Sequence, residues 1–162
     1  MAAPASQFAN TLEPRIRALL AEHEDQVAAG TSRLFAILMP LQWMAAIAVT
    51  LWISPRTWAG TESSMHPHVW LALVLGGALT SLPLFLAIAR PSSILTRHAI
   101  AAEQMLMSAF LVHLTGGRIE THFHIFGALA FLAYYRDWRV LVTATIVTAL
   151  DHAVRGLYFP LS

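Results

Sequence analysis

The chain has 162 residues, of which 57% are hydrophobic and only 12% are charged, and its formal net charge is +1. Soluble domains carry about 25% charged residues, so this composition excludes an ordinary water-facing globular domain. All ten basic residues are arginine, and so small a charge balance gives no broad basic face for binding nucleic acid. Cysteine is absent, which excludes disulfides and thiolate metal sites, so a metal would need nitrogen or oxygen ligands, or methionine as a soft ligand.

The amino-terminal segment reads as a polar, amphipathic helix, because it lacks the basic start and apolar core of a signal peptide. A solvated leader is the simplest interpretation, and a dimer contact or a helix lying on the lipid surface are the alternatives. The Gly-Thr-Ser segment 30–32 is expected to end this helix. We therefore divide the chain into a cytoplasmic amphipathic leader helix, residues 1–32, and a transmembrane sensor domain, residues 33–162.

Two long uncharged runs decide the fold class. Residues 34–55 and 69–89 contain no charged side chain, and each is long enough to cross a hydrocarbon core, which takes about 20 residues of helix. Three further runs, 98–115, 119–135 and 139–157, are apolar but interrupted by polar residues. The sequence therefore predicts an all-α fold, a polytopic membrane helical bundle with about five transmembrane helices embedded in the lipid bilayer.

Arginines near the ends of the spans set the expected orientation. With the amino terminus in the cytoplasm, the inner side holds Arg15, Arg17, Arg33, Arg90, Arg97, Arg136 and Arg139. The outer side then holds only Arg56, Arg118 and Arg155. This bias predicts a multi-pass protein of the inner (cytoplasmic) membrane, with its amino terminus in the cytoplasm.

Polar groups gather in the stretch HLTGGRIETHFHIFG, residues 113–127, although the surrounding sequence is apolar. Its Thr-Gly-Gly-Arg segment reads as a turn between the third and fourth helices. The fifth helix ends on the same side of the membrane, so its last polar residues are expected to join the cluster. Four histidines and two carboxylates from three helices should thus converge near the outer surface: His113, Glu120, His122, His124, Asp151 and His152.

Ionisable groups in membrane spans are costly, which makes this cluster a candidate functional site. Imidazoles with a carboxylate suit copper, iron or zinc in a mononuclear or dinuclear site, and haem b between two facing histidines is the alternative. The predicted metal ligands are His113, Glu120, His122, His124 and His152. Asp151 and Thr148 are expected to lie behind them and orient them, although Asp151 could instead pair with Arg155. The sequence does not decide which of His122 and His124 points into the site.

Other polar positions are expected to have structural roles. Glu103 should pair with Gln104 or Arg97. The histidines of the MHPH segment, residues 65–68, are most simply surface residues of an outer loop, and the alternative is that they join the outer cluster. Two adjacent glycines in the second span, residues 76–77, permit close contact between helices.

The sequence from residue 113 to residue 156 also resembles a known family. HLTGGRIETHFH, YRDWRVL and DHAVRG occur together and in order, as in the membrane region that precedes histidine-kinase, diguanylate-cyclase or chemotaxis-receptor output modules in many bacterial signalling proteins. The resemblance covers about residues 97–160. It implies a sensory role in a bacterial inner membrane, a homodimer, and a cytoplasmic output module reached through a further helix beyond these 162 residues.

The sequence therefore predicts a non-enzymatic membrane sensing domain that binds a transition metal, detects O₂, NO or the metal itself, and relays to a cytoplasmic output. No catalytic residue is predicted. One alternative is a haem- or metal-containing membrane redox protein or enzyme. Another is a structural or assembly subunit whose histidines only form hydrogen bonds.

Overall fold

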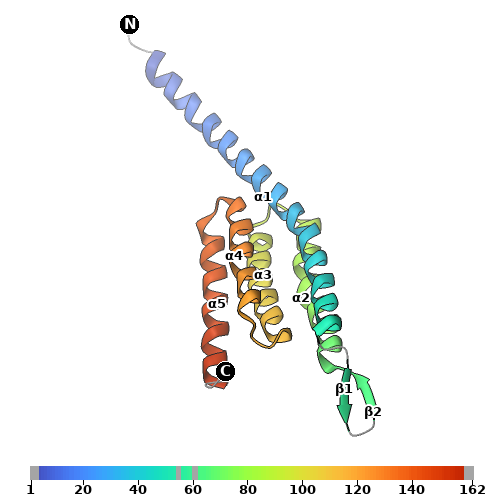
Figure 1. Ribbon diagram of the computed structural model, residues 1–162. Helices are drawn as coiled ribbons and strands as arrows, with labels where there is room; N and C mark the ends of the chain where they lie inside the picture. The colour runs from blue at the N-terminus through green and yellow to red at the C-terminus, as the bar shows by residue number, and fades with distance from the viewer. Residues whose placement is uncertain (1–3, 54–55, 60–61, 159–162) are drawn as a thin grey trace.

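The computed structural model describes residues 4–53, 56–59 and 62–158 and consists of five helices, a 3-10 turn and a short hairpin (Figure 1). The helices are α1 (Pro4–Ile53), α2 (Pro67–Ala89), α3 (Ile94–Leu114), α4 (Ile119–Leu132) and α5 (Trp138–Tyr158). The 3-10 turn η1 (Ala133–Tyr135) follows α4, and the antiparallel strands β1 (Arg56–Ala59) and β2 (Glu62–Met65) connect α1 to α2. The five helical segments expected from the sequence are confirmed.

The helices run up and down, so the bundle has two distinct ends (Figure 1). The strands β1 and β2, the turn between α3 and α4, and the last turn of α5 lie at one end, which we call the hairpin end. The α2–α3 loop and η1 lie at the opposite end, where α1 extends beyond the bundle. Helix α3 is central because it contacts all four other helices, and its buried residues extend from Thr96 to Leu114.

Helix α1 is continuous through residues 30–32, so the expectation that this segment ends the helix was wrong. The Thr31 hydroxyl donates to a carbonyl one turn earlier in the same helix, at 2.9 Å. The Ser32 hydroxyl donates to Pro91 O at 2.6 Å and shares a 2.9 Å hydrogen bond with the Tyr135 hydroxyl. Both side chains therefore find partners within the helix or across the bundle, and neither caps a helix end. The division of the chain at residue 32 stays a prediction.

Helices α1 and α2 approach closely because Trp43 lies over two glycines of α2. The Trp43 indole N–H donates to Ala72 O at 2.9 Å, which fixes the ring against the backbone. A Cβ atom at Gly76 would lie 2.8 Å from Trp43 Cδ1, and one at Gly77 would lie 2.9 Å from Trp43 Cζ2. Only glycine fits under the ring at this distance, which confirms that these residues permit close helix contact.

Three helices are long and apolar enough to cross a membrane: Leu12–Ile53, Pro67–Ala89 and Trp138–Leu157. Their most apolar windows have mean hydropathies of 2.0, 2.2 and 1.4. Large apolar side chains point outward from them, and on α2 the most exposed are Trp70, Val74, Leu82, Phe85 and Ile88. Such surfaces match hydrocarbon better than water. Three candidate spans are fewer than the five expected, because α4 has only 14 residues and α3 carries buried polar groups near its middle.

Candidate functional site

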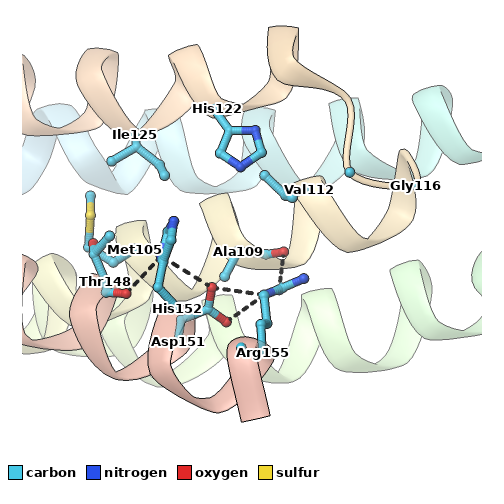
Figure 2. A pocket seen from close by; sticks show the side chains of 12 residues that line it. Met105, Ala109, Val112, Gly116, His122, Ile125, Thr148, Asp151, His152 and Arg155 are labelled. Atoms are coloured by element: carbon cyan, nitrogen blue, oxygen red, sulfur yellow. Dashed lines mark hydrogen bonds and ion pairs between the residues drawn. The ribbon is translucent and has the colours of Figure 1, made fainter. Parts of the chain in front are cut away.

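A cavity of about 510 Å³ opens between α3, α4 and α5, toward the hairpin end of the bundle (Figure 2). Its apolar wall includes Met105 and Val112 of α3 and Ile125 of α4. Its polar groups come from His122 of α4 and from the end of α5. This combination of apolar walls and a few converging polar groups is typical of small-molecule and cofactor sites.

A two-glycine turn shapes the mouth of this cavity. Gly116 and Gly117 have φ angles of 69° and 79°, in the left-handed region that glycine adopts without strain. The Gly117 N–H donates to Val112 O at 2.9 Å, which closes the end of α3. Because α4 then begins at Ile119, as expected, His122 falls within its first turn and reaches the cavity.

Two imidazoles, His122 and His152, face each other across the cavity (Figure 2). Their ring centroids are 6.4 Å apart and their planes are inclined by 68°. His122 Nδ1 donates to Arg118 O at 3.2 Å, and His152 Nδ1 donates to Thr148 O at 3.0 Å. A proton on each Nδ1 leaves Nε2 as the nitrogen with a free lone pair, the arrangement found in histidines that bind metals.

Thr148 and Asp151 both line the cavity, and Asp151 forms the pair with Arg155 that the sequence offered as the alternative. The backbone carbonyl of Thr148, and not its hydroxyl, contacts the His152 ring. The Thr148 hydroxyl instead donates to Ala144 O at 3.0 Å. The Asp151 carboxylate lies 3.9 Å from His152 Nδ1 and pairs mainly with Arg155. Asp151 therefore belongs chiefly to an ion pair on the cavity wall.

Arg155 joins the end of α5 to the middle of the bundle. Its Nε lies 3.0 Å and 2.9 Å from the two oxygens of Asp151. Its Nη2 donates to Ala109 O of α3 at 2.7 Å (Figure 2). Ala109 lies in a helix, where its carbonyl also serves the backbone ladder. The contact with α3 has no signal in the sequence, because nothing in an apolar helix marks which carbonyl an arginine will reach.

His113 lies apart from the cavity, at the end of α3 facing α2. The ring centroids of His113 and His68 are 5.4 Å apart, and those of His68 and His66 are 4.4 Å apart. His66 caps the start of α2, where its Nδ1 accepts from His68 N at 3.1 Å. The MHPH histidines thus meet His113 in a second, separate group at the hairpin end.

His124 and Glu120 also point elsewhere. His124 Nδ1 shares a 2.7 Å hydrogen bond with the Ser108 hydroxyl of α3, inside the bundle. Glu120 lies exposed in the first turn of α4, where the positive end of the helix dipole stabilises its negative charge. Of the five predicted ligands, the structure therefore brings only His122 and His152 to the cavity.

Across the described residues, no group of three or more histidine, aspartate or glutamate side chains has a geometry that could hold a metal ion. The cavity instead offers two imidazoles beside a neutralised Asp151–Arg155 pair. Two nitrogen donors are an incomplete metal site by themselves, and the other coordination positions would need water, a small exogenous ligand or a porphyrin.

Comparison with known proteins connects the chain to signalling. It is 31% identical over 119 residues to Transducer protein Htr8 of Halobacterium salinarum, in an alignment that covers 67% of this chain and 18% of that protein. The chain therefore spans about a fifth of the length of this curated relative. No protein-family model and no solved structure matches the chain. The chain is similar to part of a transducer protein, which supports membrane association and a signalling role.

Proposed function

We propose that this chain is the membrane-embedded sensing region of a signalling protein, and that the cavity between α3, α4 and α5 is its ligand site. One observation carries the proposal: His122 and His152 face each other across this cavity with both Nδ1 atoms tied to carbonyls. The similarity to a transducer protein favours a sensor without catalytic activity over a redox enzyme.

The ligand is proposed to be a transition metal, copper, iron or zinc, held by the two Nε2 atoms, and haem b is the alternative. Imidazole suits all three metals, and two facing histidines are also the usual axial pair for a bis-histidine haem. Such a centre would supply an open or exchangeable position for O₂ or NO, or the metal itself would be the signal. The apolar wall of the cavity would keep bulk water from the bound group.

All five helices are proposed to cross the membrane, with the amino terminus in the cytoplasm of a bacterial cell. The up-and-down arrangement supports this proposal, because α3 and α4 lie within the same layer as the three apolar helices (Figure 1). Helix α4 is short, but with η1 it has 17 residues, or about 25 Å at 1.5 Å per residue. The cavity would then lie near the outer membrane face.

The signal would reach the cytoplasmic side at the end opposite the cavity, where α1 extends beyond the bundle (Figure 1). This extension exposes Leu12, Ile16, Leu19 and Leu20. We propose that these residues support a homodimer and that the region acts on a cytoplasmic kinase, cyclase or chemotaxis output module. A response requires two bundle states that differ in ligand affinity.

Elemental analysis with a visible absorption spectrum tests the proposed ligand. The protein is purified in detergent without chelators or nickel resin, so that native metal is neither removed nor replaced. We expect copper, iron or zinc in a simple ratio to protein, and a Soret band would identify haem. Protein that is colourless, metal-free and unable to take up any of the three metals would refute the proposed ligand and leave the sensory role without this site.

A further inference from the structure

A buried polar network at the centre of the bundle lies outside the candidate ligand site. Glu103 and Gln104 of α3 are 2% and 0% exposed. Gln104 Nε2 donates to Glu103 Oε2 at 2.8 Å and to Gln42 Oε1 of α1 at 2.7 Å, and Gln42 Nε2 donates back to Gln104 Oε1 at 2.9 Å. These hydrogen bonds tie α1 to α3 across 62 residues of sequence.

Two oxygen atoms in this network lack partners. The Thr80 side chain of α2 lies next to the Glu103 carboxyl. Yet Glu103 Oε1 and Thr80 Oγ1 are both buried without a well-formed hydrogen bond in the described part of the chain. Thr80 is 2% exposed, so water does not reach it readily. Buried polar atoms in this state are rare and need an explanation.

Cations do not compensate the Glu103 carboxyl. Arg97, on the same helix, pairs with Asp137 at 3.4 Å, and Arg155 of α5 pairs with Asp151. His124 of α4 is bound to the Ser108 hydroxyl. On α2 the uncharged Thr80 lies beside Glu103, and on α1 the uncharged Gln42 binds the neighbouring Gln104. No ion pair with Glu103 exists among the described side chains.

The position of Glu103 makes an uncompensated charge costly. It lies nine residues after the start of α3 and eleven before its end, or about 14–17 Å from either end at 1.5 Å per residue. In a membrane-spanning helix this is close to the middle of a hydrocarbon core about 30 Å thick. An isolated carboxylate at such a depth is strongly disfavoured, whereas a neutral carboxyl keeps one O–H donor that needs an acceptor.

We propose that Glu103 is a proton-binding site at the centre of the bundle, where its neutral carboxyl donates from Oε1 to Thr80 Oγ1 and ties α2 to α3. The same carboxyl accepts from Gln104, whose amide also bonds Gln42 of α1, so the network joins three helices. Loss of that proton to water would leave a charge with no cationic partner and break the link between α3 and α2. The proton would thus bind at a site separate from the α3–α4–α5 cavity. The proton site stands by itself, and only the idea that proton binding acts as a signal rests on the proposed sensory function.

Infrared spectroscopy of the protein in lipid vesicles tests the proton site. At neutral pH we expect a carbonyl stretching band of a protonated carboxyl in the wild type, absent in Glu103→Gln and retained in the exposed control Glu120→Gln. Thr80→Val, with Glu103 intact, should shift this band, and Thr80→Ser should restore it. An identical carboxyl region in wild type and Glu103→Gln would overturn the proposal, and so would a band that Thr80→Val does not move.

The pH dependence of unfolding tests the same site by a second route. A folded state that holds a proton released on unfolding loses stability as pH rises. We therefore expect the thermal midpoint of the wild type to fall relative to that of Glu103→Gln as pH rises from about 4.3, the ordinary value for an exposed glutamate, to neutral. Parallel curves would contradict the proposal. Because neither measurement depends on a metal, failure here is distinguishable from failure of the proposed ligand.

Discussion

Replacing His152 by alanine is expected to lower the metal content of the purified protein by at least about tenfold, and His122→Ala should do the same. Each imidazole lines the cavity with its Nδ1 bound to a carbonyl, so each would supply one Nε2 atom as a ligand. Losing either leaves a single nitrogen donor, which cannot hold a transition metal against water and buffer. The measurement is metal per protein after equal purification of each variant, together with the absorption spectrum if a haem is present.

Two matched controls sharpen this prediction. His113→Ala and His124→Ala remove the same side chain from positions that the structure places outside the cavity. Both variants are expected to keep their metal. The opposite pattern, with metal lost from His113→Ala and kept in His152→Ala, would move the site to the group formed by His66, His68 and His113.

Arg155→Gln is expected to destabilise the fold by about 1–3 kcal/mol, because it leaves a half-buried carboxylate without its cation and removes the hydrogen bond from α5 to Ala109 O of α3. The native guanidinium contacts both Asp151 oxygens and Ala109 O. This loss of stability is modest because the Arg155 side chain is 34% exposed, so solvent screens part of the ion pair. Thermal unfolding in the same detergent measures the change.

The double variant Asp151→Asn, Arg155→Gln, compared with the single variants, completes a double-mutant cycle that isolates the free energy of the ion pair. It should recover part of the lost stability, because no unpaired charge remains. Arg139→Gln is the control, since Arg139 lies exposed at the other end of α5, near the Trp138 ring, and forms no ion pair among the described residues. Equal losses of stability from Arg155→Gln and Arg139→Gln would show that the contacts of Arg155 with Asp151 and Ala109 O contribute nothing.

The helices and the glycine turn could be predicted from the sequence because both depend on local properties. Long apolar runs define the helices, and two adjacent glycines supply the positive φ angles at residues 116 and 117. The end of the first helix was mispredicted for an opposite reason. Thr31 and Ser32 resemble helix-ending residues, but their hydroxyls are satisfied by a carbonyl in the same helix and by groups across the bundle.

The candidate site was only partly predictable, because depth in the membrane is easier to infer than direction around a helix. Alternation of helices correctly placed His122 and His152 at the same end of the bundle. Each residue turns the side chain by about 100°, however, so His122 and His124 point to different neighbours. Only the packing of α4 against α3 shows that His122 reaches the cavity and His124 reaches Ser108.

The network around Glu103 shows the same limit. The sequence offered Gln104 or Arg97 as the partner of Glu103, and the structure shows the contact with Gln104, at 2.8 Å. The partners on other helices, Gln42 and Thr80, lie far away in sequence and carry no local signal of their role. They become visible only when α1, α2 and α3 are packed together.

Single-cysteine labelling tests the central claim most directly, because the natural sequence contains no cysteine. Glu120→Cys and Gly156→Cys place exposed thiols at the hairpin end, and Ser93→Cys and Ala133→Cys place thiols at the opposite end. If all five helices cross the membrane with the cavity toward the outside, a membrane-impermeant reagent labels the first two in intact cells and the second two only after permeabilisation. Labelling of Glu120→Cys only after permeabilisation, while Gly156→Cys is labelled in intact cells, would contradict the account, because α3 and α4 would then not span the bilayer. A reversal at all four sites would contradict the proposed orientation.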